Sequence, residues 1–574
     1  MDITYKKTNN SQLFENFKNA DLLNMESCQN YIPLYNNFFK LNNSNYNNIN
    51  LNNENTLFSI NEKISENRYK GIIITENDNK VTRDVFFKFS PLLDPYKYLA
   101  GKYDISDNKI FILPQFENNN CYDKVCDPNN SAYVDSFFTY LTSQLLNCKD
   151  FIHGLDFYGS FLGVKNEYHI DIGDDLDILA NSDYFHKNKH LYRFINSDHE
   201  EIFNDQSRDN KKTISLGNDV EDLSILNLEN LTSLEVTQDN EIGIDETNLL
   251  YNNNNINNSK SNKSNKSNKS NKSNKSNKSN KSNNSSSSEI SSRSSNTEKS
   301  GNREDNNPSI SSNSSNTSSE SETDAIMVSL NKFPVQIISL ECCENTFDDL
   351  LANDELNDEE LTCAIIQILM MLITYQNLFN LTHNDLHTNN IMYIKTDKRY
   401  LYYKYNNKHY KVPTFGKIFK IIDFGRAIYK YKGQLICSDS FHKDGDAATQ
   451  YNFEPYYNDN KPLVEPNMSF DLCRLGCSIY DFIIDDYDSP NSKMRPIHKI
   501  IIDWCVDDQG RNILYKNNDE ERYPDFKLYK MIARKVHKHT PHNVIENRLF
   551  SKYVVSKRDI KKGSKIMNID NLLI

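Results

Sequence analysis

A repeat without apolar residues interrupts the chain and limits how the remainder can fold. Seven successive Ser-Asn-Lys triplets run from Ser261 to Lys281, and a Ser-rich stretch follows them. Such a repeat has no apolar face to bury, so it cannot stack into a solenoid. We predict a disordered, repeat-expanded insertion with its centre at 210–324; a basic tether for nucleic acid or acidic lipid is the alternative. The folded part must then combine sequence from both sides of the insertion.

Composition favours a soluble protein of a reducing compartment. The net charge of −13 argues against nucleic acid as the main partner. The N-terminal segment lacks the apolar core of a secretory signal, and the longest apolar run, Ala364–Thr374, is too short to span a bilayer. The cysteines show no paired C-x-x-C spacing. Neither the adjacent Cys342 and Cys343 nor the pair Cys473 and Cys477 predicts a zinc site or a disulfide framework.

Shifts in composition divide the chain into segments. Residues 1–55 are rich in Asn and predict either a poorly ordered leader or a peripheral extension. A globular composition begins at Leu57 and returns after the insertion. The first compact part is predicted at 56–165, and the insertion at 166–329 follows it. A strand with its linker at 330–344 leads into a second compact part at 345–550, and a C-terminal tail occupies 551–574.

Local patterns predict the elements that flank the polar motifs. Val81–Phe89 has the β-branched and aromatic character of a strand, and Val335–Glu344 has the pattern of a buried strand. Apolar residues recur at helical spacing from Asp358 to Leu381. Further predicted elements are an amphipathic helix, a strand directly after it and an extended hairpin, at Ser131–Leu146, Phe151–Leu155 and Tyr400–Phe415.

A polar stretch between the long helix and the next strand has a spacing that chemistry can use. In L-T-H-N-D-L-H-T-N-N-I-M-Y-I, Asp385 and Asn390 are five residues apart, and Asp423-Phe424-Gly425 follows on a later apolar strand. Phosphoryl transfer needs a carboxylate that accepts a proton and oxygen ligands that hold Mg²⁺. Gly425 would let the backbone turn sharply beside Asp423. Singly these residues predict only turns, but their order and spacing favour phosphoryl transfer.

These motifs carry a family resemblance. H-N-D-L-H-T-N-N followed by D-F-G resembles the catalytic loop and the metal loop of the eukaryotic-type protein kinases. Phe470–Gly476 resembles the D-x-W-x-x-G segment of that family, with Cys473 where Trp is usual. Glu341–Glu344 resembles the hinge that binds adenine, and Thr346–Leu351 resembles the short helix after it. The features occur in the family's order.

The resemblance implies an α+β, bilobal protein-kinase-like fold, with a small β-rich lobe, a larger helical lobe and the disordered insertion in the smaller one. It also implies ATP and Mg²⁺ as cofactors. Asp385 would be the catalytic base, and Asn390 and Asp423 would be metal ligands. His383 would pack beneath the metal loop, and Asp471 would hold the backbone of the catalytic loop.

The resemblance also implies residues for the adenine and the phosphates. Leu340 would be the gatekeeper, and Glu341 and Cys343 would bind adenine through backbone groups. In R-Y-K-G-I-I-I-T-E-N-D-N, the expected phosphate-covering flap, only Gly71 remains of the G-x-G-x-x-G pattern.

A strand lysine and a helical acid complete the implied nucleotide site. Lys88 in V-F-F-K-F stands where the family's lysine binds the α- and β-phosphates; an outward-facing strand lysine is the alternative. Asp135 is the only carboxylate of its predicted helix and would hold Lys88. A helix-surface or N-terminal dipole role for Asp135 is an equal alternative.

Several positions depart from the family pattern. His387 stands where protein-serine kinases usually have Lys, and the form D-L-H-x-x-N also occurs in haspin-like and small-molecule kinases. With an unperturbed pKa of about 6.5, His387 is predicted as either neutral or charged. Asn384 replaces the typical Arg, so control through an Arg–phosphate contact is not expected there. Three residues of the expected activation segment are interpreted as ordinary loop hydroxyls rather than phosphorylation sites: Ser438, Ser440 and Thr449.

We expect a protein kinase that transfers the γ-phosphoryl group of ATP to serine or threonine hydroxyls of protein substrates. A small-molecule kinase of the same superfamily is one alternative, and a pseudokinase scaffold is the other. The Asn/Lys/Ile/Tyr-heavy composition and the run T-H-N-D-L-H-T-N-N-I-M resemble serine/threonine-protein kinases of giant DNA viruses, mimivirus-like ones in particular. That resemblance implies action in host-cell cytoplasm or in the virion, without secretion. The oligomeric state is not predicted.

Overall fold

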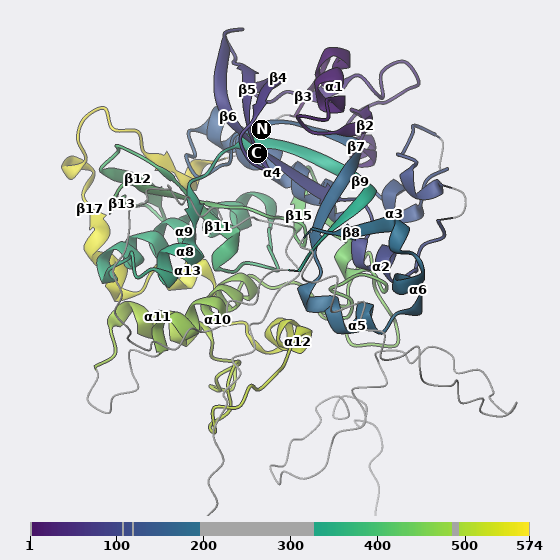
Figure 1. Cartoon of the computed structure of the whole chain (residues 1–574). Helices are drawn as coiled ribbons and strands as arrows, with labels where there is room; N and C mark the ends of the chain where they lie inside the picture. The colour runs from purple at the N-terminus through teal and green to yellow at the C-terminus, as the bar shows by residue number, and fades with distance from the viewer. Residues whose placement is uncertain (1–2, 106–107, 118–119, 196–325, 485–492, 573–574) are drawn as a thin grey trace, which may run out of the picture. The chain divides into compact units, whose positions relative to one another are not determined.

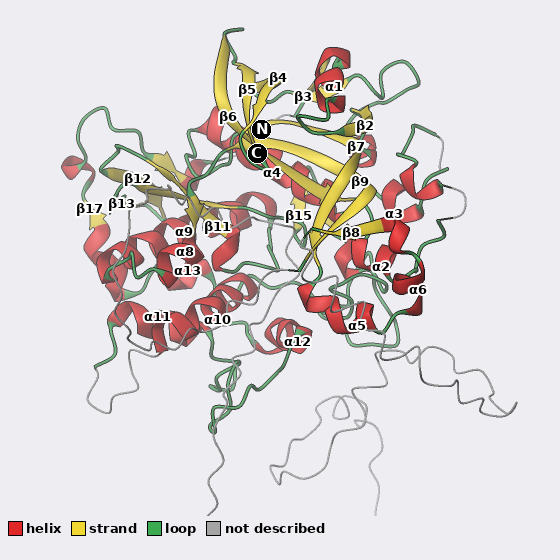
Figure 2. Ribbon diagram, viewed as in Figure 1, coloured by secondary structure: helices red, strands yellow, loops and turns green. Residues whose placement is uncertain are grey.

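A computed structural model describes residues 3–105, 108–117, 120–195, 326–484 and 493–572 (Figure 1). They belong to one of two compact units, and the other unit, Asn204–Glu289, lies outside the described residues. The Ser-Asn-Lys repeat and the predicted disordered centre at 210–324 lie outside them too. The described unit is a mixed α/β structure with a curled sheet (Figure 2).

The largest sheet draws its strands from both sides of the insertion. Its order is β2-β7-β9-β6-β5-β4, with β8 paired to β9, and every pairing in it is antiparallel. Residues 196–325 lie in sequence between β8 and β9, and these two strands are themselves paired in this sheet. The strands are Met25–Gln29 (β2), Thr56–Lys63 (β4), Arg68–Ile74 (β5), Lys80–Pro91 (β6), Phe157–Asp171 (β7), Tyr192–Phe194 (β8) and Met327–Glu341 (β9).

The predicted limits of the insertion, 166–329, are too wide. Residues 166–195 complete β7 and add α5 (Leu176–Ala180), α6 (Asp183–Lys187) and β8. Tyr168 and Ile170 are buried, so β7 continues its alternation of buried residues well beyond residue 165.

Residues 3–55 cover one face of the large sheet. In α1 (Ser11–Lys18), the ring centroid of Phe17 lies 6.2 Å from that of Phe87 on β6 and 5.5 Å from that of Phe161 on β7. β2 adds an edge strand to β7. A poorly ordered leader is therefore the wrong interpretation, and the alternative of a peripheral extension fits these contacts.

The long helix α4 (Ser131–Lys149) lies against β7 and β9 (Figure 1). Every residue from Ala132 to Leu145 is buried, so the predicted amphipathic helix is enclosed on all sides instead. It also meets the long helix α9 (Asp358–Phe379): the ring of Phe138 lies 5.6 Å from that of Tyr375 and 5.2 Å from that of Phe379.

The strand predicted at Phe151–Leu155 is a buried turn, and β7 begins only at Phe157. A Cβ atom at Gly154 would lie 2.0 Å from the carbonyl oxygen of Thr142 on α4. The apolar run is therefore explained by close packing against α4 rather than by strand pairing.

The helix α9 (Asp358–Phe379) forms the centre of the second half of the unit. It begins at a capping box made by Asn357 and Glu360. Among the described residues it is the one helix long and apolar enough to cross a membrane, but 89% of its apolar window is buried inside the protein. It is therefore a core helix. Around it lie α8 (Phe347–Ala352), α10 (Phe470–Ile484), α11 (Pro496–Trp504), α12 (Phe526–Lys535) and α13 (Pro541–Val544).

Small sheets connect this helical part to the loops that carry the polar motifs. β10-β11-β14 form one sheet, β17-β13-β12-β18 form another, and β15 and β16 form a hairpin. The predicted hairpin at Tyr400–Phe415 is confirmed as β12 and β13. The bounds are Asn345–Thr346 (β10), Ile391–Lys395 (β11), Tyr400–Tyr405 (β12), Lys408–Pro413 (β13), Lys417–Ile421 (β14), Ile428–Tyr431 (β15), Gln434–Cys437 (β16), Val554–Val555 (β17) and Met567–Asn568 (β18).

Two further features differ from the sequence-based expectation. The predicted tail 551–574 supplies β17 and β18, so its described residues are part of a sheet. Cys121 and Cys126 form a disulfide that the cysteine spacing did not predict. The remaining short elements are Tyr5–Lys7 (β1), Ile49–Leu51 (β3), Pro95–Leu99 (α2) and Asp123–Cys126 (α3).

Candidate functional site

The loop after α9 is held from α10 by one buried carboxylate. Oδ2 of Asp471 accepts the backbone N–H of His383, and Oδ1 accepts that of Asn384, both at 2.9 Å. Asn384 has a φ of 66°, a conformation that Asn tolerates better than most residues. The backbone contact expected of Asp471 is therefore present. It holds the backbone of the two residues directly before Asp385.

Asp385 lies among cations and a tyrosine hydroxyl. The hydroxyl of Tyr529 on α12 donates to its Oδ1 at 2.8 Å, and Nη1 of Arg426 lies 3.4 Å from its Oδ2. Nε of Arg474 donates in turn to the Tyr529 hydroxyl at 2.9 Å. Burial acts to raise the pKa of Asp385, but Arg426 and the other polar neighbours outweigh it and lower this pKa. Asp385 is thus kept as a carboxylate, the form in which it can accept a proton.

Tyr529 was not predicted from the sequence. It lies 144 residues after Asp385, and the pattern around it predicts only a helix. A partner so distant in sequence can be identified only from the tertiary structure, in which α12 packs against α10.

Asn390 presents an unpaired oxygen inside the protein. Its Nδ2 donates to the carbonyl of Asp385 at 2.9 Å and to Nε2 of His387 at 3.1 Å, which fixes the orientation of the amide. Its Oδ1 is buried and has no hydrogen-bond partner. A buried acceptor without a partner costs stability unless another group binds it, and amide oxygens are suitable ligands for Mg²⁺. Asn390 therefore fits the role of a metal ligand.

The surroundings of His387 favour its neutral form. Burial lowers its pKa to about 4, and Nε2 accepts a hydrogen bond, as a ring nitrogen without a proton does. Of the two predicted forms, the neutral one is the form that these contacts favour near pH 7.

The D-F-G stretch turns at the aspartate. Asp423 has a φ of 63°, whereas Gly425 does not adopt a positive φ, so the sharp turn predicted at Gly425 occurs at Asp423. Phe424 is buried, and its ring lies 5.2 Å from that of His383. Nε2 of His383 also lies 2.9 Å from the carbonyl of Ile422. The packing expected of His383 beneath this loop is confirmed.

Lys88 joins three distant segments. Its Nζ lies 2.8 Å from Oδ2 of Asp135 on α4 and 2.9 Å from Oδ1 of Asp423, and its side chain is 16% exposed. Oδ1 of Asp135 accepts the backbone N–H of Phe424 at 2.8 Å. The outward-facing alternative for Lys88 is therefore wrong, as is a surface role for Asp135.

The charges of this cluster shift the pKa values of its members. Burial alone would lower the pKa of Lys88, but the two carboxylates raise it above its usual value. Burial raises the pKa of Asp135, and Asp423 adds to this effect while Lys88 opposes it. The contacts described join two carboxylates to one ammonium group, and carboxylate oxygens are ligands that Mg²⁺ prefers.

Gly71 is not in a turn. It lies in the middle of β5, opposite Ile60 on β4 and Arg83 on β6. A Cβ atom there would approach Cγ2 of Val85 to 2.8 Å, so packing between strands explains this glycine. The β4–β5 connection spans residues 64–67 and contains no glycine. Gly71, the one glycine left of the expected flap pattern, therefore lies outside the turn and supplies no backbone cradle for phosphates there.

The predicted hinge residues lie at the end of β9. Leu340 is buried and Glu341 is the last strand residue. The side chain of Glu341 accepts the N–H of Asp156 at 2.8 Å and pairs with Lys420, so it points into the protein. Nη2 of Arg68 donates to the carbonyl of Cys343 at 3.0 Å, so this carbonyl is engaged by Arg68.

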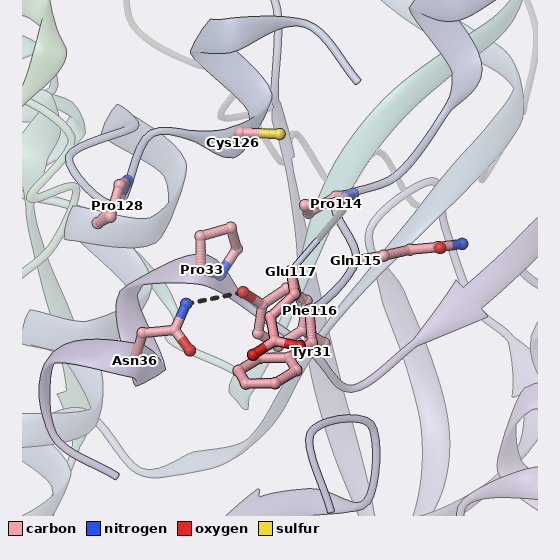
Figure 3. Close-up of a pocket in the computed structure, with 9 residues that line it drawn as sticks. All are labelled: Tyr31, Pro33, Asn36, Pro114, Gln115, Phe116, Glu117, Cys126 and Pro128. Carbon is pink, nitrogen blue, oxygen red and sulfur yellow. Dashed lines mark hydrogen bonds between the residues drawn. The ribbon is translucent and has the colours of Figure 1, made fainter. Parts of the chain in front are cut away.

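The described cavities do not include these residues. A surface cavity of about 270 Å³ lies elsewhere, and Figure 3 shows Asn36 donating to the hydroxyl of Tyr31 at its edge. Within the described ranges no group of three or more His, Cys, Asp or Glu side chains is placed to hold a metal ion. A cation bound to Asp423 would therefore need further oxygen ligands, which the amide oxygen of Asn390 and the oxygens of a bound molecule could supply.

Comparison with known proteins gives no family. No protein-family model matches the chain, and no curated protein is significantly similar to it in sequence. Any assignment of function therefore rests on the side-chain geometry.

Proposed function

We propose that this chain is a bilobal, ATP- and Mg²⁺-dependent protein kinase that transfers the γ-phosphoryl group to serine or threonine hydroxyls of protein substrates. The observation that carries the proposal is the contact of Lys88 with both Asp135 and Asp423. Phosphoryl transfer by protein kinases requires a strand lysine, a helical acid that holds it and a metal-binding aspartate to be in place together.

Each residue has a defined part in the proposed reaction. Asp385, ionised and oriented by Tyr529, would accept the proton of the acceptor hydroxyl. Lys88 would bind phosphate oxygens while Asp135 holds its ammonium group. Asn390 Oδ1 and Asp423 would hold Mg²⁺, which neutralises charge on the phosphates when bound. Leu340, Glu341 and Cys343 would border the adenine.

A pseudokinase scaffold is the second candidate. It is favoured by the β4–β5 turn, whose residues 64–67 include no glycine to bring backbone N–H groups close to phosphates. The ionised Asp385 and the unpaired Asn390 oxygen favour catalysis instead.

The test is transfer of radiolabelled phosphate from ATP, with Mg²⁺, to the chain itself and to generic basic and acidic proteins. Acid-stable label on serine or threonine that disappears in both Asp385→Asn and Asp423→Ala would support the protein kinase. Mg²⁺-dependent ATP binding without transfer to any protein would direct attention to a small-molecule acceptor. Neither binding nor transfer would leave the scaffold.

A further inference from the structure

The segment after Asp423 is fastened to the start of α4 by one buried carboxylate. Asp439 follows β16 and is 5% exposed. Its Oδ1 accepts the backbone N–H of Ser131, the first residue of α4, at 3.0 Å, and its Oδ2 pairs with Nζ of Lys124. Its own N–H donates to the carbonyl of Asn129 at 2.8 Å. Three contacts from one residue thus join parts of the chain that are about three hundred residues apart.

This anchor acts on the helix that carries Asp135. Ser131 and Asp135 are four residues apart, so they lie one turn apart along α4. Asp439 binds the first turn of α4 at Ser131. One turn further along, Asp135 binds both Lys88 and the backbone N–H of Phe424. A carboxylate at a helix N-terminus is also favoured by the helix dipole. A displacement of α4 would break these bonds together.

Neither of the two serines that flank Asp439 is poised to take over this role by phosphorylation. Ser438 and Ser440 are buried. The Ser438 hydroxyl donates to the carbonyl of Gly425 at 2.6 Å and accepts the N–H of Ser440 at 3.2 Å. Phosphates on these residues would have to displace existing bonds.

Arg426, the cation that follows Gly425, is already paired with a carboxylate of the segment. Arg426 binds Oδ2 of Asp446 through Nε and Nη2, at 3.0 and 2.7 Å. Asn384 stands where an arginine could have met a phosphate, and its side chain is engaged: Oδ1 accepts the Tyr451 hydroxyl at 2.7 Å. Neither the Arg426 guanidinium nor the Asn384 side chain is therefore left waiting for a phosphoryl group.

We propose that Asp439 is a positioning residue: paired with Lys124 and bound to the N–H of Ser131, it holds α4, and through α4 the Lys88–Asp135 pair, in the arrangement needed for transfer without phosphorylation of the chain. This inference rests on the proposed kinase function and names how that site is kept in its active form.

The experiment compares phosphatase-treated full-length protein, shown free of phosphate by intact mass, with four variants. Asp439→Asn removes the charge, Lys124→Met removes its partner, and the double variant combines them. Asp444→Asn is the matched control, because this exposed aspartate lies in the same segment and its side chain does not contact α4.

We expect full activity in the dephosphorylated wild type and in Asp444→Asn. In Asp439→Asn and in Lys124→Met, kcat should fall roughly tenfold with KM for ATP changed less, and the double variant should fall no further than the worse single one. Lys124→Met keeps the bond to Ser131, so it tests the idea even if Asp439→Asn unfolds.

Loss of wild-type activity on dephosphorylation would overturn the inference while leaving the kinase itself in place. An unchanged kcat in both single variants would also overturn it. A wild type that transfers no phosphate at all would overturn the proposed function, and this inference with it.

Discussion

The two ionic clusters of the site are built from similar groups but differ in their balance of charge. Lys88 meets two carboxylates, those of Asp135 and Asp423. Asp385 lies instead near two guanidinium groups, those of Arg426 and Arg474. The pKa of Asp135 is raised by burial and by its acidic neighbour, whereas the pKa of Asp385 is lowered because the cations outweigh burial.

This difference suits two different tasks. A cluster with surplus negative charge gains stability when a divalent cation binds, and one with matched charge keeps its carboxylate ionised without help. The first cluster is therefore expected to respond to Mg²⁺, and the second is not.

The largest effect is expected on phosphate transfer when either cluster loses its central carboxylate. Asp385→Asn and Asp423→Ala should each reduce the rate by about 10²–10⁴-fold or more, since the first removes the base and the second a metal ligand. The rise in Tm produced by Mg²⁺ and ATP should persist in Asp385→Asn and vanish in Asp423→Ala. Asp397→Ala, at an exposed position, is the control. Equal loss of binding in both variants would contradict the division of tasks.

Removal of the cation from the first cluster should strongly destabilise the protein. Lys88→Met leaves the buried carboxylate of Asp135 and the partly buried one of Asp423 without their shared partner, and removal of one member of a buried ion pair costs about 3–5 kcal/mol of unfolding free energy. Mg²⁺ alone should recover part of this loss, because it can replace the missing positive charge. Denaturant unfolding with and without Mg²⁺ measures both effects.

Lys165→Met is the matched control, since Lys165 is another buried lysine of the same sheet and contacts neither carboxylate. If Mg²⁺ stabilised both variants equally, the surplus of charge around Asp423 would not be the cause.

Loss of the tyrosine hydroxyl from the second cluster should have a smaller effect. Tyr529→Phe removes one hydrogen bond to Asp385 and one from Arg474, and bonds to charged groups contribute about 1.5–3 kcal/mol. We expect a lower kcat with little change in the Mg²⁺ response, measured by transfer rates and Tm shifts. Tyr192→Phe, which removes a buried hydroxyl bonded to the Phe185 carbonyl, should leave kcat unchanged.

The smallest effect is a pH dependence from His387, which lies beside Asn390. Its pKa is lowered to about 4 by burial, so the unfolded chain binds a proton below about pH 6.5 and the folded protein does not. Stability should therefore fall as the pH drops from 6.5 towards 4, by about 2 kcal/mol between pH 7.5 and 5. His387→Gln should lose this share of the pH dependence in urea unfolding, whereas His442→Gln, at an exposed histidine, should keep it. A dependence unchanged in His387→Gln would show that folding does not lower the pKa of this ring.

Much of the secondary structure could be predicted because its signals are local. β6, α4, α9 and the β12–β13 hairpin follow from apolar spacing and β-branched residues within one window. The errors occurred where a local pattern had a tertiary cause. Phe151–Leu155 is apolar because it packs beneath α4, and Gly71 is a glycine because Val85 leaves no room for a side chain.

The candidate site could be predicted only in part, for the same reason. Asp385, Asn390 and Asp423 were found from spacing and order. Tyr529, Arg474 and Asp439 carry no local signal, and their roles arise from partners up to about three hundred residues away.

The sequence by itself determined the contacts between residues that are only a few positions apart. Asp385 and Asn390 belong to one loop, and the 3₁₀ turn Thr388–Asn390 joins them through a hydrogen bond that spans five residues. Only the tertiary structure decided which carboxylates Lys88 would meet, since strand, helix and loop must first pack together. It also decided the charge state of His387 and Asp385, because a pKa depends on burial and on the sum of nearby charges.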